Sequence, residues 1–98
     1  MKKHLFYIGL NDKDTKKQEL SKEQFLNIIH DTVGDCTISD AIGYYTHDNG
    51  ELVKENSLRV EMLFKQDSDI PKFADRLKKE LNQESIGYEY TESNSVLL

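Results

Sequence analysis

A chain of 98 residues with regularly recurring apolar positions is large enough for one modest core, so we expect a single domain over residues 1–98. The formal net charge of −5 disfavours nucleic-acid binding, because phosphate contacts need clustered Lys and Arg. The single cysteine, Cys36, excludes an internal disulfide, and the apolar run near the start reaches polar Asn11 within a few residues, which argues against a signal peptide. No segment is apolar over the thickness of a bilayer, so a cytoplasmic location is expected.

The first predicted element is a strand over residues 5–10. Its core-facing residues, at alternate positions, are Phe6, Ile8 and Leu10. Leu5 and Tyr7 then face the other side of the sheet, where a solvated strand usually carries polar groups. This second apolar side indicates that something covers the outer face.

A helix is predicted to begin at Ser21, a natural N-cap with Gln24 as its capping-box partner. The residues that form its buried stripe are Phe25, Ile28, Ile29 and Val33. Gly34 stands where a left-handed residue commonly ends a helix. The spacing therefore predicts one amphipathic helix between residues 21 and 34.

A long β-hairpin over residues 36–64 is the centre of the predicted fold. A three-residue loop at Asp48, Asn49 and Gly50, with glycine in the left-handed position, pairs Ile38 with Val60 and brings the apolar residues onto one face. That inner face carries Ile38, Ile42, Leu58, Val60 and Met62, together with Asp40, whose carboxylate needs a partner or access to water. The outer face carries Gly43, Tyr45, Glu55, Ser57 and Arg59.

A second amphipathic helix is predicted after Asp67, with Pro71 in its first turn and Leu81 near its end. A last strand follows over residues 86–90, with Tyr88 facing the same side as its apolar neighbours. The chain ends in Val96, Leu97 and Leu98, and we expect this apolar tail to pack on its own domain or on a second copy.

The predicted order is strand, helix, strand, strand, helix, strand. This is the ferredoxin-like βαββαβ arrangement of the α+β class, with a four-stranded antiparallel sheet and two helices on one face. The other face of the sheet stays open in such an arrangement. A fold of this kind does not by itself decide what that face binds.

The segment 37–45 and the residues that follow it resemble a family of small bacterial ferredoxin-like domains of unknown function. The shared pattern consists of Gly43, Tyr45, Gly50, Glu55 and Ser57. The family's aromatic residue is usually tryptophan, where this chain has Tyr45. The resemblance implies the same fold and a site on the outer face, but it implies no reaction.

The candidate ligand-binding or interface residues all fall on or beside the outer face; they are Tyr7, Tyr45, His47, Glu55, Ser57 and Arg59. Because no nucleophile, metal cluster or cofactor motif is visible, the main prediction is a non-enzymatic binding or assembly module that forms a homodimer through this face. One alternative is a domain that binds or sequesters a small nucleotide-like metabolite at the same residues. The other is an enzyme in which His47 or Glu55 acts as general base. We assign no catalytic residue, metal or cofactor at this stage.

Overall fold

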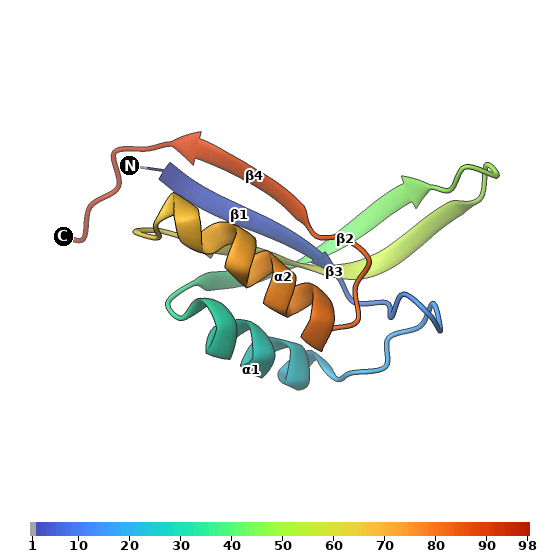
Figure 1. Ribbon diagram of the computed structural model, residues 1–98. Helices are drawn as coiled ribbons and strands as arrows, with labels where there is room; N and C mark the ends of the chain where they lie inside the picture. Colours follow the sequence, from blue (N-terminus) through green and yellow to red (C-terminus); the bar gives the residue numbers. More distant parts are fainter. Residues whose placement is uncertain (1) are drawn as a thin grey trace.

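The computed structural model describes residues 2–98 and has the predicted order of elements. The elements are β1 (Lys2–Gly9), α1 (Lys22–Val33), β2 (Thr37–Thr46), β3 (Leu52–Met62), a short 3-10 turn η1 (Asp67–Asp69), α2 (Ile70–Glu80) and β4 (Gly87–Glu92). The four strands are antiparallel in the order β2-β3-β1-β4, and both helices lie on one face of the sheet (Figure 1). The ferredoxin-like prediction is confirmed.

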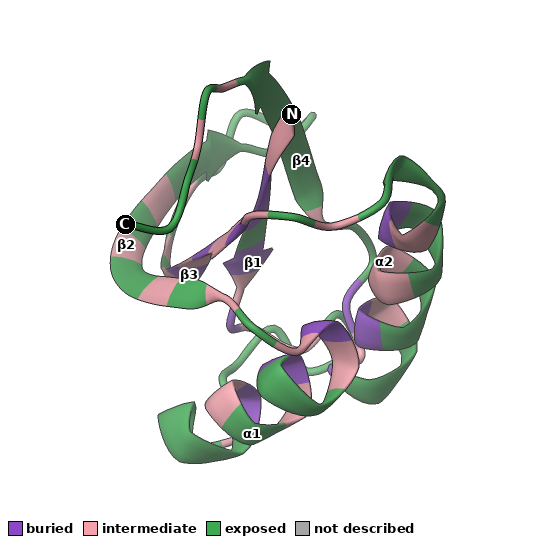
Figure 2. Ribbon diagram, turned by 90° about the vertical axis from the view of Figure 1, so that its left-hand side faces the viewer, coloured by how far each residue is buried: buried purple, intermediate pink, exposed green. Residues whose placement is uncertain are grey.

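The core lies between the helices and the inner face of β1 and β3, where Figure 2 shows the buried residues. Phe6, Ile8 and Val60 are fully buried there, as are Ile29 of α1 and Leu77 of α2. These positions follow the strand period of two and the helical spacing seen in the sequence. The alternating apolar residues of β1 and β3 therefore form the sheet surface against which the helices pack.

The first helix begins and ends where the sequence indicates. The Ser21 side chain accepts the Gln24 N–H at 3.1 Å, and the Gln24 side chain accepts the Ser21 N–H at 2.8 Å. Gly34 has a φ of 74°, a conformation that favours glycine, and its N–H donates to the His30 carbonyl. The second helix has its proline in the first turn, as expected.

The hairpin has the predicted register, with Ile38 opposite Val60 and Gly43 opposite Glu55. Its loop closes through the His47 N–H, which donates to the Glu51 carbonyl at 2.8 Å, and Gly50 has a φ of 87°. On the inner face, Asp40 reaches Lys22 of α1 at 2.8 Å and remains largely in water. That contact supplies the partner that its carboxylate needs.

The far half of the hairpin, residues 42–56, extends beyond the helices, and we call it the arm (Figure 1). An 11-residue strand such as β3 spans about 36 Å, whereas a 12-residue helix such as α1 spans only about 18 Å. Ile42, predicted to be in the core, is therefore 57% exposed, and Tyr44 and Leu52 beside it are exposed as well. The inner-face prediction is wrong at Ile42 because no helix reaches it.

Other sequence predictions are also corrected at the ends of elements. Leu5 is buried at 1% exposure within the chain itself, so its position does not require an outside partner. Phe64 continues the alternation of Leu58, Val60 and Met62 and is expected on the inner face, but it lies beyond β3 with a φ of 61° and is exposed. The side chains of Val96 and Leu97 are 69% and 82% exposed, so the tail does not pack on its own domain.

Among residues 2–98, the structure has no helix with the length and apolar character of a membrane span.

Candidate functional site

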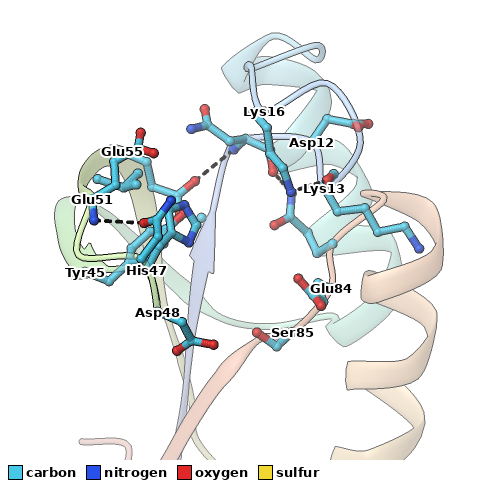
Figure 3. A pocket seen from close by; sticks show the side chains of 15 residues that line it. Asp12, Lys13, Lys16, Tyr45, His47, Asp48, Glu51, Glu55, Glu84 and Ser85 are labelled. Atoms are coloured by element: carbon cyan, nitrogen blue, oxygen red, sulfur yellow. Dashed lines mark hydrogen bonds between the residues drawn. The ribbon is translucent and has the colours of Figure 1, made fainter.

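A hollow lies at the end of β1, between the arm and two loops that follow β1 and α2. We call this hollow, of about 890 Å³, the cleft. One wall is formed by Tyr45, His47, Glu51 and Glu55 of the arm, and the opposite wall by Asp12, Lys13, Lys16, Glu84 and Ser85 (Figure 3). Three segments that are far apart in sequence thus meet around one space.

Glu55 lies at the inner end of the arm, where the cleft meets β1. One carboxylate oxygen, Oε2, accepts the backbone N–H of Asn11 at 3.1 Å. The carboxylate lies directly against Gly9, whose missing side chain leaves the space that it occupies. Glu55 is therefore a half-buried acid whose position is determined by two backbone neighbours.

Tyr45 and His47 lie along the arm on the same side as Glu55, with their rings edge to face at a centroid distance of 5.4 Å. Burial raises the pKa of the Tyr45 phenol, and the negative charges of Glu55 and Glu51 raise it further. The hydroxyl therefore stays protonated and can donate a hydrogen bond. Because the two rings are nearly perpendicular, an aromatic ligand can stack on the face of one of them but not on both at once.

Acidic side chains outnumber basic ones around the cleft. Its lining carboxylates are Asp12, Asp48, Glu51, Glu55 and Glu84, and its lysines are Lys13 and Lys16. Charges interact more strongly in a partly enclosed cleft than in bulk water, because the effective dielectric constant is lower. The cleft therefore suits a ligand that carries a positive charge or several hydroxyl groups.

The wall opposite the arm is held together by hydrogen bonds between the two loops. The Asn82 side chain donates to Asp12 at 2.8 Å, and this bond, followed by the backbone N–H groups of Asp14 and Thr15, lowers the pKa of Asp12. Gln83, which is 9% exposed, donates to the Asn11 carbonyl at 2.9 Å. These bonds connect the loop after β1 to the loop before β4 and hold the two loops together.

The structure divides the six residues predicted from the sequence into two groups. Tyr45, His47 and Glu55 line the cleft. Ser57 lies between them and the second group, opposite Gly9 of β1. Tyr7 and Arg59 are farther along the outer face and do not line the cleft.

Tyr7 and Arg59 belong to a network of charged and polar groups on the outer face. The Tyr7 hydroxyl donates to Glu89 at 2.6 Å, and Arg59 forms an ion pair with Glu61 at 2.5 Å. A hydrogen bond to Tyr7 raises the pKa of Arg59. Because these groups pair with one another within the chain, this part of the outer face is a polar surface.

The sequence interpretation missed the loop residues of the cleft. It gave no role to residues 11–14, to Gln83 and Glu84, or to Gly9. The topology contained a usable signal, because β1 and β4 are antiparallel neighbours, so the end of β1 must lie beside the loop that precedes β4. Polar residues in both loops could have been placed together on that ground.

Two solved structures are similar to this chain over most of its length. One is a phage SAM (S-adenosylmethionine) lyase in complex with S-methyl-5'-thioadenosine, with a TM-score of 0.68 and 23% identity over 93% of this chain and 80% of that one. The other is a phage SAM lyase in the apo state, with a TM-score of 0.64 and 22% identity over 92% and 78% of the two chains. At this level of identity the likeness shows a shared fold.

No family model and no curated protein matches the sequence, so the resemblance to small bacterial domains stays a prediction. The main functional prediction, a non-enzymatic assembly module, is contradicted by the structural neighbours, which are lyases, one of them with a bound nucleoside. They fit the alternative better, a domain that binds a small nucleotide-like metabolite at the same residues. Among residues 2–98, the structure has no group of three or more His, Cys, Asp or Glu side chains that could hold a metal ion.

Proposed function

We propose that this chain binds S-adenosylmethionine in the cleft and cleaves it, with S-methyl-5'-thioadenosine as the nucleoside product. The observation that carries the proposal is the acidic cleft with a positioned carboxylate, Glu55, on a fold shared with a phage SAM lyase that binds this nucleoside. The similarity extends over 93% of this chain.

The charge of the cleft supports this substrate. S-adenosylmethionine carries a sulfonium cation, whereas S-methyl-5'-thioadenosine is a neutral thioether. When the bond between sulfur and the departing carbon breaks, its electron pair stays on sulfur, and the carbon fragment loses a proton or bonds to one of its own groups. Five carboxylates around the cleft attract the cation, and Glu55 is placed to contact it or to accept a proton.

The arm supports a role in binding the nucleoside. A purine can stack on the face of the Tyr45 or the His47 ring, and the protonated Tyr45 hydroxyl can donate to a ring nitrogen or a ribose oxygen. Glu51 can accept hydrogen bonds from the ribose hydroxyl groups. In this assignment the aromatic rings bind the nucleoside and Glu55 acts at the sulfur.

The neighbouring tyrosines of β2 provide a matched test. Tyr45 lines the cleft, whereas Tyr44 points to the opposite face and is 64% exposed. We expect Tyr45→Ala to weaken binding of S-adenosylmethionine at least tenfold in titration calorimetry, and Tyr44→Ala to leave it within about twofold. Chromatography should detect S-methyl-5'-thioadenosine accumulating with the wild-type chain and with Tyr44→Ala. Equal binding by both variants would contradict the location of the site.

A second candidate is binding without cleavage. The same cleft supports it, because the aromatic rings and acids suit a nucleoside whether or not a reaction follows. The two candidates separate in one experiment. If calorimetry shows binding while chromatography shows no product above the uncatalysed background, the chain is a nucleoside-binding domain and the proposed lyase reaction is wrong.

A second copy of the chain as partner, and a cytoplasmic location, stay predictions. The outer face near Tyr7 is a paired polar network, so the support for a homodimer comes instead from Ile42, Tyr44 and Leu52, which leave the arm with an exposed apolar face. Light scattering at micromolar concentration tests this, and a monomer mass would contradict it.

A further inference from the structure

Gly9 stands at the end of β1, opposite Ser57 of β3, and beneath the Glu55 carboxylate. A Cβ at this position would overlap Oε1 of Glu55 and would lie 2.5 Å from Cδ and 2.8 Å from Oε2. Non-bonded carbon and oxygen atoms do not approach so closely. The carboxylate can therefore occupy its present position only because residue 9 has no side chain.

The backbone of Gly9 does not itself require glycine. Its φ is not among the positive values, in contrast to Gly34 and Gly50, so an alanine could adopt the same strand conformation. The atoms that an added methyl group would meet all belong to the flexible end of one side chain. The expected consequence of Gly9→Ala is thus a displaced carboxylate within an intact sheet.

A second backbone group completes the arrangement. The Asn11 N–H donates to Oε2 of Glu55 at 3.1 Å, and the Asn11 carbonyl accepts from the largely buried Gln83 side chain at 2.9 Å. The Gln83 side chain thus fixes the backbone of Asn11, and the Asn11 N–H in turn fixes the carboxylate of Glu55. Among residues 2–98, Oε1 of Glu55 has no hydrogen-bond partner, so it is available to a ligand in the cleft.

We infer that Gly9 is a positioning residue: its missing side chain, together with the Asn11 amide, sets the place and direction of the Glu55 carboxylate in the cleft. The use of that carboxylate on S-adenosylmethionine rests on the proposed function. The placement of the carboxylate by Gly9 does not depend on which ligand the cleft takes.

The test compares Gly9→Ala with Glu55→Ala, and takes Gly87→Ala as the control. Gly87 is also a strand glycine beside β1, but a Cβ there would meet Tyr7 at 3.3 Å, away from the cleft. The first readout is the amide proton shift of Asn11 in NMR spectra of the ligand-free chain. We expect Gly9→Ala to move this signal to the value seen in Glu55→Ala, and Gly87→Ala to leave it unchanged.

The second readout is affinity for S-adenosylmethionine, which we expect Gly9→Ala to lower about tenfold while the melting temperature changes by only a few degrees. The double variant Gly9→Ala with Glu55→Ala should bind no more weakly than Glu55→Ala alone, because both changes remove the same carboxylate from the same place. If Gly9→Ala leaves the Asn11 signal at its wild-type position, the positioning role is wrong.

The two proposals fail in different ways. If the wild-type chain binds neither S-adenosylmethionine nor its thioether product, the proposed function fails, while the Asn11 signal still decides the role of Gly9. If Gly9→Ala does not fold, the double variant removes the overlap with Glu55 and should fold again. Failure of both to fold would show that Gly9 serves the sheet itself and would overturn the inference.

Discussion

The two halves of the β2–β3 hairpin have the same alternating pattern but different surroundings. In the half near the helices, Leu58 and Val60 are 1% and 0% exposed against α1 and α2. In the arm, Ile42 and Leu52 are 57% and 67% exposed on the same inner face. Alternation thus identifies which residues share a face, and the length of the covering helices decides how much of that face is buried.

Because of this difference, one half of the hairpin contributes mainly to stability and the other half mainly to the cleft. The covered half contributes to the core, whereas the arm contributes Tyr45, His47 and Glu55 to the cleft and has few packing partners of its own. Segments with little buried apolar contact open more readily than core strands. Substitutions in the two halves should therefore affect different measurements.

The largest expected effect is on folding. Leu58→Ala removes a buried side chain from the covered half and should lower the free energy of unfolding by about 2–5 kcal/mol, measured by urea denaturation. Leu52→Ala makes the same change in the exposed arm and should cost less than about 0.5 kcal/mol. Similar losses for the two variants would mean that the arm is as well packed as the core.

An effect of intermediate size is expected for charge recognition. Glu55→Gln keeps the size of the side chain but removes its charge, so it should weaken binding of cationic S-adenosylmethionine about tenfold and binding of neutral S-methyl-5'-thioadenosine much less. Added salt should reduce the difference between the two ligands in the wild-type chain. Calorimetry with both ligands measures this, and equal weakening would exclude a role for the Glu55 charge in selecting the cation.

The smallest effect concerns the Tyr45 phenol, whose pKa is raised by burial and then by Glu55 and Glu51. Because the folded pKa lies above the unfolded one, this group's contribution to stability is complete below about pH 10 and is lost as the pH rises through the folded pKa. Burial also raises the pKa of Tyr88, so ultraviolet titration should show more than one late-ionising tyrosine, of which Tyr45→Phe removes one and Glu55→Gln shifts that same one to lower pH. Tyr44→Phe should leave that late transition in place.

The sequence was sufficient for the elements whose signals are local. The capping box at Ser21, the loop glycine Gly50 and the alternation around Val60 determine the first helix and the hairpin register, and the structure confirms them. The site was only partly predictable. Tyr45, His47 and Glu55 share a face of one hairpin, so their register brings them together, whereas the loop residues join them only through the order of strands.

Two other features depended on long-range packing. His4 was given no role in the sequence interpretation, yet it is buried at 1% exposure, and its Nδ1 lies 2.6 Å from the Tyr88 hydroxyl on β4. Glu55 and Gly9 come into contact only because β3 pairs with β1. Neither contact leaves a periodic signal in the chain, so no local pattern could predict it.

The central position of β1 has a consequence for folding kinetics. This first strand pairs with β3 and β4, which lie far along the chain, so the sheet closes only through contacts of high sequence separation, and such contacts form slowly. The cleft takes one wall from the loop before β4 and the other from the arm. A ligand in the cleft would therefore bind only after the last strand has joined the sheet, and ligand binding in a refolding experiment would mark the end of folding.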